Sequence, residues 1–221
     1  FLTSYMPNPN VGSKVHFQNM IEQSILAEKL GYKKVSIPEH HLINLLMMPS
    51  PLQMAVKIAS LTKNISISTS VAVLPLHDMR TYAGEVATAD ILTDGRLILG
   101  VARGAFPWEM KRLGTPIEHS KEKFTESLEV LQKLLSEEEV SFSGKYYNFE
   151  ALTIMPRPIT QPIPIMIAAM DPKSIKNAAL RGFHVQSTVL SGTRELLMER
   201  VNAFRDGCEE LGEKGKLLKL S

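Results

Sequence analysis

Residues 65–102 read ISISTSVAVLPLHDMRTYAGEVATADILTDGRLILGVA, and this stretch decides the fold class. The β-branched residues that crowd 65–76 predict a strand. Residues 80–92 then predict a helix, Asp94-Gly95 a turn, and 96–102 a second apolar strand. A strand, a helix and a strand in this order predict two parallel strands joined by a right-handed crossover.

The same alternation extends along the chain in both directions. Further strands are expected at 1–5, 33–39, 162–170 and 184–189, with the start of another at 217–221. Further helices are expected at 14–30, 51–62, 121–138, 171–182 and 191–212. After an insertion over 103–121, residues 140–154 predict a hairpin-like excursion with a turn at Ser143-Gly144.

An open doubly wound sheet and a closed (β/α) barrel would both satisfy this pattern. The barrel is favoured because candidate functional residues follow several strands and because no G-x-G-x-x-G motif follows the first strand. We therefore predict an α/β protein with a TIM-type barrel, forming a single domain over 1–221. The chain begins within a predicted strand and ends at the start of another, so we expect residues missing at its front and the last strands missing or not covered at its C-terminus.

The amino-acid composition argues against a nucleic-acid-binding protein, a disulfide-linked protein and a membrane-spanning protein. The chain has 221 residues, of which 44% are apolar and 22% charged, with a formal charge of +2. Its basic residues are spread along the chain, so no nucleic acid partner is implied. The single cysteine, Cys208, excludes an intrachain disulfide and fits a reducing compartment, which predicts the cytoplasm. No apolar run approaches the roughly 20 residues of a membrane span.

Three ionisable residues, Glu39, His40 and His41, stand where the predicted strand at 33–39 ends. Barrel enzymes place their sites at the ends of the strands. A histidine exchanges protons near neutral pH, and Glu39 could orient one of the rings. Neighbours on a strand point to opposite faces, so at most one histidine would face the centre. Two exposed loop histidines are the alternative.

A third histidine, His77, follows the next predicted strand and would lie near the same rim. Several histidines and acids near one rim could suggest a metal. Their spacing is irregular and spread over separate loops, so no metal site is predicted.

Two features could bind an anion. Arg103 follows the strand at 96–102 between two glycines, where its planar guanidinium could hold a phosphate; a structural ion pair with a carboxylate is the alternative. Asp171 is a natural N-cap before Pro172, and Ser174 falls in the first turn of the same predicted helix. Ser174 and the free N–H groups there could meet a phosphate, although capping without a ligand is equally expected.

Apolar loop residues at 45–48 and 106–108 would give the rim an apolar side, unless they are buried against neighbouring loops. An apolar pocket with a phosphate clamp and a histidine suits a flat, phosphorylated cofactor.

At these residues the chain resembles the bacterial luciferase-like family of flavin-dependent monooxygenases. The matching pieces occur in the family's order: FLTSYMP, EHH, VAVLP, TDGRLILGVARG, FPWE, KYYNF before MPRP, and PIPIMIAAM followed by AALRG. Each piece is weak alone, but the ordered set is specific and spans essentially the whole chain. The resemblance implies a (β/α) barrel with further C-terminal strands.

The resemblance also implies an activity. Family members use reduced FMN and dioxygen to oxidise an organic substrate, here expected to be small and apolar, such as an aldehyde or another carbonyl compound. A separate flavin reductase as the source of reduced FMN, and a homodimer, are implied as well.

Positions matching the family motifs suggest roles for individual residues. His40, beside Glu39, corresponds to the catalytic histidine of EHH. Arg103 corresponds to the arginine on the FMN phosphate, and Ser174, at the helix that Asp171 caps, to a hydroxyl on the same phosphate. The family's non-proline cis peptide beneath the flavin ring falls at Ser70-Val71.

Three positions depart from the luciferases themselves. Ala102 stands in place of a cysteine, while Met170 and Gly84 stand in place of acidic residues. These departures make light emission doubtful and leave the substrate open.

Two other functions fit the same residues. Related barrels transfer hydride with a deazaflavin and without dioxygen, and the luciferase-like group also includes non-catalytic flavin-binding subunits. The intact EHH argues against the second, since a binding subunit does not need the catalytic histidine.

Overall fold

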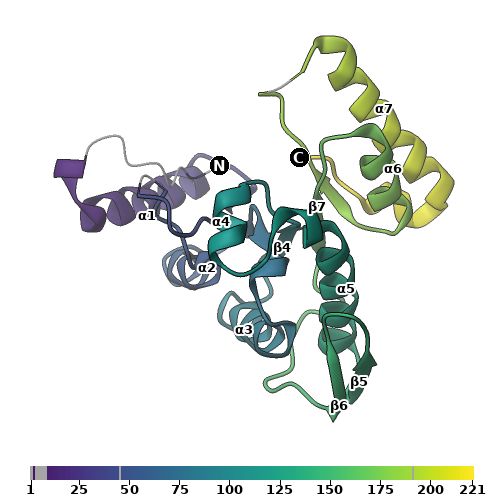
Figure 1. Ribbon diagram of the computed structural model, residues 1–221. Helices are drawn as coiled ribbons and strands as arrows, with labels where there is room; N and C mark the ends of the chain where they lie inside the picture. Colours follow the sequence, from purple (N-terminus) through teal and green to yellow (C-terminus); the bar gives the residue numbers. More distant parts are fainter. Residues whose placement is uncertain (1, 3–8, 45, 191) are drawn as a thin grey trace. The chain divides into compact units, whose positions relative to one another are not determined.

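The computed structural model describes Leu2 and residues 9–44, 46–190 and 192–221 (Figure 1). The chain divides into two compact units, the first comprising 1–99 and 103–163 and the second 100–102 and 164–221. Apart from Leu2, the strand predicted at 1–5 lies outside the described residues. Each unit is described by itself, and the single domain expected over 1–221 stays a prediction.

The first unit alternates strands and helices, as the sequence predicts. Its strands are β1 (Lys34–Ile37), β2 (Ser66–Thr69), β3 (Ala72–Val73), the beginning of β4 (Leu97–Ala102), β5 (Val140–Ser143) and β6 (Asn148–Leu152). Its α-helices are α1 (Ser13–Lys29), α2 (Pro51–Ala59), α3 (Met79–Leu92), α4 (Pro107–Arg112) and α5 (Ile117–Ser136), with 3-10 turns η1 (Pro9–Val11) and η2 (Leu74–Leu76).

The parallel sheet predicted from the sequence is present in this unit. Strand β1 pairs with β2 in parallel, Ile37 opposite Thr69, and β2 pairs with β4 in parallel, Ile67 opposite Leu97. The side chains of Ile37, Ile67 and Leu97 are fully buried. Burial on both faces explains why these strands are almost continuously apolar, as parallel strands covered by helices usually are.

The strand predicted over 65–76 is shorter than expected. Strand β2 ends at Thr69, the peptide bond between Ser70 and Val71 is cis, and β3 contains only Ala72 and Val73 before the 3-10 turn η2. Propensity alone could not show this interruption, because β-branched residues recur up to Val73 and no glycine or proline lies within 65–73. The insertion expected at 103–121 likewise holds a short helix, α4, and the following helix begins at Ile117 rather than at 121.

The hairpin predicted at 140–154 is confirmed as the antiparallel pair β5–β6. The N–H of Gly144 donates to the carbonyl of Tyr147 at 2.8 Å and closes the turn. Helix α5 fixes the hairpin, which lies beside it in Figure 1: the carboxylate of Glu126 accepts the N–H groups of Tyr146 and Tyr147 at 2.7 Å each.

The second unit contains β7 (Ile165–Ala168), α6 (Pro172–Leu180), β8 (His184–Gln186), α7 (Arg194–Leu211) and the 3-10 helix η3 (Gly212–Leu217). Strands β7 and β8 are parallel, with Ile167 opposite Val185. The start of a strand expected at 217–221 is visible as a parallel bridge between Leu220 and Val185. No described helix in either unit is long and apolar enough to cross a membrane.

Candidate functional site

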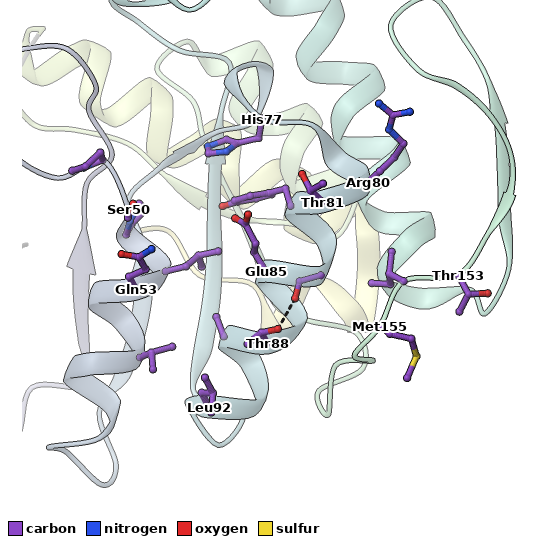
Figure 2. Close-up of a pocket in the computed structure, with 18 of the residues that line it drawn as sticks. Ser50, Gln53, His77, Arg80, Thr81, Glu85, Thr88, Leu92, Thr153 and Met155 are labelled. Atoms are coloured by element: carbon purple, nitrogen blue, oxygen red, sulfur yellow. Dashed lines mark hydrogen bonds between the residues drawn. The ribbon is translucent and has the colours of Figure 1, made fainter.

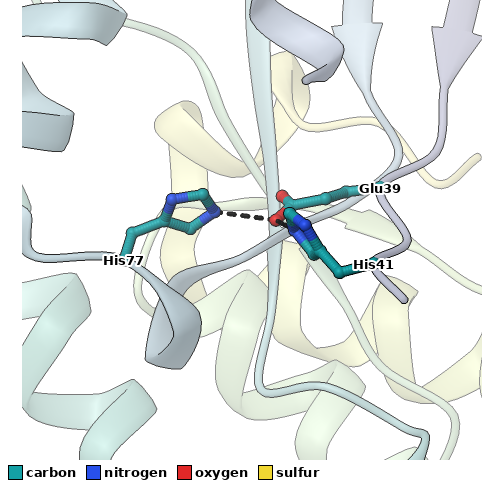
Figure 3. A group of neighbouring side chains, drawn as sticks. All are labelled: Glu39, His41 and His77. Atoms are coloured by element: carbon teal, nitrogen blue, oxygen red, sulfur yellow. Dashed lines mark hydrogen bonds and ion pairs between the residues drawn. The ribbon is translucent and has the colours of Figure 1, made fainter. Parts of the chain in front are cut away.

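Glu39 lies just beyond the end of β1 and organises the site. Its side chain is buried, and one carboxylate oxygen, Oε1, lies 2.6 Å from Nε2 of His41 and 2.8 Å from Nε2 of His77 (Figure 3). The other oxygen, Oε2, accepts the backbone N–H of Val73 at 3.0 Å. Both oxygens are therefore used, and the carboxylate connects the ends of β1 and β3 with the segment that follows η2.

These contacts determine the charge of the cluster. Burial by itself would raise the pKa of Glu39, but the hydrogen bonds and positive charge of His41 and His77 outweigh it and hold the pKa at about 2. The hydrogen bond to Glu39 raises the pKa of His41, against the opposing effect of partial burial. Glu39 is therefore an anion at neutral pH that favours the protonated form of His41.

The ring of His77 stacks on Tyr82 of α3, with centroids 4.4 Å apart and planes at 27°. The Tyr82 hydroxyl is buried and has no hydrogen-bond partner in the part of the chain that the structure describes. Burial, together with the negative charges of Glu39 and Glu85, raises the pKa of Tyr82 well above its usual range. The Tyr82 side chain therefore stays uncharged, and its ring packs against the His77 ring and fixes the orientation of that ring.

Glu109 is the residue that sequence reasoning missed. It lies on α4, is only 2% exposed, and accepts the backbone N–H of His41 through Oε1. Its other oxygen, Oε2, is 3.8 Å from Nδ1 of His40. The motif FPWE contributed to the family resemblance, but no role was inferred for its acid. A carboxylate within a short helix that starts at a proline next to aromatic residues was the available signal.

His40 is held on several sides. Its backbone N–H donates to the carbonyl of Met48 at 2.8 Å, and Phe106 meets its ring edge-on at a centroid distance of 5.3 Å. The Nδ1 atom is buried, and among the described residues it has no hydrogen-bond partner. The side chain as a whole is 23% exposed, so part of the ring remains accessible.

Some of the apolar loop residues are exposed at the rim and others are buried, so each of the two alternatives predicted from the sequence holds for part of them. Met48 is 1% exposed and belongs to the core, whereas Phe106 and Trp108 are 38% and 40% exposed. Leu45 lies outside the described residues. Leu46 and Met47 are partly exposed, so the apolar residues that remain accessible include these two and the aromatic pair.

Arg103 follows β4 and is exposed. Its guanidinium forms no hydrogen bond or ion pair with the described residues, so the structural ion pair considered as an alternative is not seen. The glycine beside it has φ +92°, and a Cβ at Gly104 would clash with the side chain of Met110 on α4. Gly104 is needed for the close approach of α4.

Asp171 and Ser174 belong to the second unit. The Asp171 carboxylate accepts the backbone N–H of Ser174 at 2.9 Å, and Pro172 occupies the first position of α6. The predicted N-cap is therefore confirmed. The cap uses the N–H of Ser174, so this group is not among the free N–H groups of the first turn. A phosphate contact through the exposed Ser174 hydroxyl stays a prediction.

The peptide bond between Ser70 and Val71 is cis, as the resemblance implied. The N–H of Ser70 donates to the carbonyl of Ile37 at 2.6 Å, which places this bond beside the end of β1. Contact between Ser70 or Val71 and a cofactor stays a prediction.

A large hollow of about 1050 Å³ lies between α2, α3 and the segment 152–155, as Figure 2 shows. His77 and Tyr82 reach it, but Glu39, His40 and Arg103 do not line it. The hollow therefore shares only His77 and Tyr82 with the surroundings of the strand-end cluster. The strand-end cluster, where ionisable groups converge, is the better candidate for chemistry.

The family model of the luciferase-like monooxygenases matches residues 1–219. The chain belongs to the luciferase-like monooxygenase family. The oxygenase component of the flavin-dependent trigonelline monooxygenase of Acinetobacter baylyi is 30% identical over 197 residues, which are 88% of this chain and 54% of that protein. An F420-dependent glucose-6-phosphate dehydrogenase of Amycolatopsis mediterranei is 29% identical over 206 residues, covering 87% of this chain and 60% of that protein. The chain spans about half the length of the curated relatives that it matches.

Solved structures share the fold of this chain. The monooxygenase RslO1 of Streptomyces bottropensis superimposes with a TM-score of 0.88 at 25% identity, covering 96% of this chain and 65% of that one. The oxygenating constituent of 3,6-diketocamphane monooxygenase of Pseudomonas putida, solved in complex with FMN, gives 0.82 at 20% identity, covering 94% and 61%. The predicted fold class, a luciferase-like α/β barrel that is incomplete in this chain, is confirmed.

Proposed function

We propose that this family member is a flavin-dependent monooxygenase that uses reduced FMN and dioxygen to oxidise a small apolar organic substrate. The proposal rests mainly on the placement of His40. Its ring lies between Glu109 and Phe106, and it follows Glu39, whose ionised carboxylate contacts His41 and His77. Such an oxidation requires the protein to control one proton transfer next to an apolar surface. The substrate class, including an aldehyde or another carbonyl compound, follows from the resemblance.

The described residues fit FMN. The exposed Arg103, which has no partner among them, can bind a phosphate through its planar guanidinium, and the ring of His40 remains partly exposed beside Phe106. Ser174, and the backbone at Ser70 and Val71, are further proposed contacts. Bound reduced FMN would supply the electrons and the reaction with dioxygen.

The protein's own residues would control the proton transfer. Because Nδ1 of His40 faces Glu109, Nε2 is the atom left to give or take a proton at the substrate side. Glu39 acts indirectly in this proposal, by holding His41 and His77 and by fixing the loop that carries His40. Phe106 and Trp108 would exclude water from the site.

The alternative is hydride transfer with a deazaflavin and without dioxygen. It is favoured by the F420-dependent relatives, which match a similar share of the chain. The Glu39 and His40 arrangement would suit either reaction, since both require a placed proton. The cofactor that the protein binds therefore separates the two.

The deciding experiment is an anaerobic titration of the protein with reduced FMN and with reduced F420, followed by admission of air. We expect preferential FMN binding and faster oxygen consumption with an apolar carbonyl substrate. His40→Gln should keep FMN affinity and lose turnover, whereas His119→Gln, an exposed histidine of α5, should keep both. Preference for F420 would favour hydride transfer, and flavin binding that is indifferent to His40→Gln would favour a binding subunit.

We further propose a cytoplasmic homodimer that receives reduced FMN from a separate reductase. The hollow between α2 and α3 offers a self-association surface, with Leu92 54% and Met155 75% exposed at its edge. Leu92→Asp should convert a dimer into a monomer in sedimentation experiments. A wild-type monomer would contradict the proposal.

A further inference from the structure

We propose that Glu39, His41 and His77 form a binding site for a divalent first-row transition metal of the Zn²⁺ type. Two imidazole nitrogens and one carboxylate oxygen converge on one point, and the three ligand atoms lie within 4.8 Å of one another (Figure 3). This donor set is that of open zinc sites and of non-haem iron sites. The inference is independent of the proposed flavin chemistry.

Two of the three ligand spacings require only small adjustments, and the two Nε2 atoms, which lie within 4.8 Å of each other, have to be brought to a similar spacing. The present contacts between Glu39 Oε1 and the two Nε2 atoms are 2.6 and 2.8 Å. With metal–ligand bonds of about 2.0–2.1 Å, ligand atoms in a tetrahedral or octahedral site lie roughly 3.0–3.4 Å apart. Each contact would have to open by a few tenths of an ångström, and the partly exposed histidine rings can turn by that amount.

The surroundings hold the three ligands in place. Val73 donates to the second oxygen of Glu39, which leaves Oε1 as the ligand atom. The backbone N–H of His41 is fixed by Glu109, and the His77 ring is fixed against Tyr82. Such outer contacts orient metal ligands and raise the affinity of a site.

The site is also open to an ion from solution. The side chains of His41 and His77 are 20% and 22% exposed, while that of Glu39 is fully buried. Three protein ligands leave at least one coordination position for water or a substrate. The metal would take the place of the Nε2 protons that now face Glu39, so binding would weaken as the pH falls.

The test uses the protein without a histidine tag, freed of metal by a chelator. Zn²⁺ is titrated calorimetrically, and Co²⁺ is added separately to record the visible absorption of a site with nitrogen and oxygen ligands. We expect one ion per chain and a Co²⁺ band that Zn²⁺ abolishes. Because glutamine can still donate to Glu39 but is a poor metal ligand, His41→Gln and His77→Gln should each lower the affinity by at least about tenfold without unfolding the protein.

The control is His119→Gln, which removes an exposed histidine of α5 outside the cluster. It should leave the affinity and the Co²⁺ spectrum unchanged. The proposal is overturned if the wild-type protein does not bind Zn²⁺ in a one-to-one ratio. It is also overturned if His41→Gln and His77→Gln bind as tightly as wild type. FMN titrations of the same samples keep this outcome separate from that of the proposed function.

Discussion

The Nδ1 atom of His40 lies 3.8 Å from Oε2 of Glu109, and the other oxygen of the same carboxylate accepts the backbone N–H of the next residue, His41. One buried acid on α4 therefore controls both histidines that follow β1. It places a negative charge near the ring of His40 and holds His41 through a backbone hydrogen bond.

This relationship predicts the effect of Glu109→Gln. The amide oxygen can still accept the N–H of His41, but the negative charge near His40 is lost. We expect kcat to fall by about tenfold or more, with KM and FMN affinity nearly unchanged, because placed proton transfer contributes about 10²–10⁴ in rate. Glu109→Asp should recover part of the loss. Steady-state kinetics and flavin titration measure both quantities.

The matched control is Glu118→Gln, an exposed acid at the start of α5. It should behave as wild type. If Glu109→Gln lowers FMN affinity and kcat together, Glu109 supports the fold of the pocket rather than the proton transfer.

Arg103→Ala should weaken FMN binding without destabilising the protein, since this exposed side chain has no partner among the described residues. A hydrogen bond to a charged group contributes about 1.5–3 kcal/mol, so we expect the Kd for FMN to rise by about 10- to 100-fold. Riboflavin, which lacks the phosphate, should bind the variant and wild type equally. Lys111→Ala, an exposed cation on α4, is the control. An equal loss for FMN and riboflavin would argue against a phosphate contact.

The regular parts of the fold could be predicted because they depend on local patterns. The parallel strands β1, β2 and β4, the hairpin after α5 and the cap at Asp171 follow from apolar runs, turn residues and capping chemistry. The interruption after Thr69 could not be read from propensity. Only the family resemblance indicated it.

The part of the site that lies within one local stretch of sequence could also be predicted. Glu39 and His40 are adjacent in the sequence and follow a clear strand, so their place at its end was evident. His77 follows the next predicted strand, so its place near the same rim was also evident, whereas Glu109 comes from a distant segment and reaches this point through the packing of α4. Spacing rules for metal ligands work best for ligands on one local segment, which is why the irregular spacing of Glu39, His41 and His77 did not predict a metal site although the three were expected near one rim (Figure 3).

Glu39→Ala tests the structural role of the buried carboxylate. The substitution leaves the N–H of Val73 and two imidazoles without their acceptor. We expect the free energy of unfolding to fall by about 3–5 kcal/mol, as when one partner of a buried ion pair is removed. Glu39→Gln should lose less, because its amide oxygen still accepts. Glu150→Ala, on the exposed surface of β6, should stay within about 0.5 kcal/mol of wild type. Urea denaturation measures all three.

The stability that His41 contributes should depend on pH in a defined direction. Its pKa is raised above the ordinary value of 6.5 by the hydrogen bond to Glu39, whose own pKa of about 2 keeps it ionised. A group with a raised folded-state pKa stabilises the protein fully below its unfolded pKa, and this contribution is lost as the pH rises through the folded pKa. The difference in unfolding free energy between wild type and His41→Gln should therefore be largest at pH values below about 6.5 and shrink as the pH rises above that value. Urea denaturation below and above this pH measures it, with His119→Gln as the control. A difference that grows with pH would show that His41 is held neutral, and that Glu39 does not favour its protonated form.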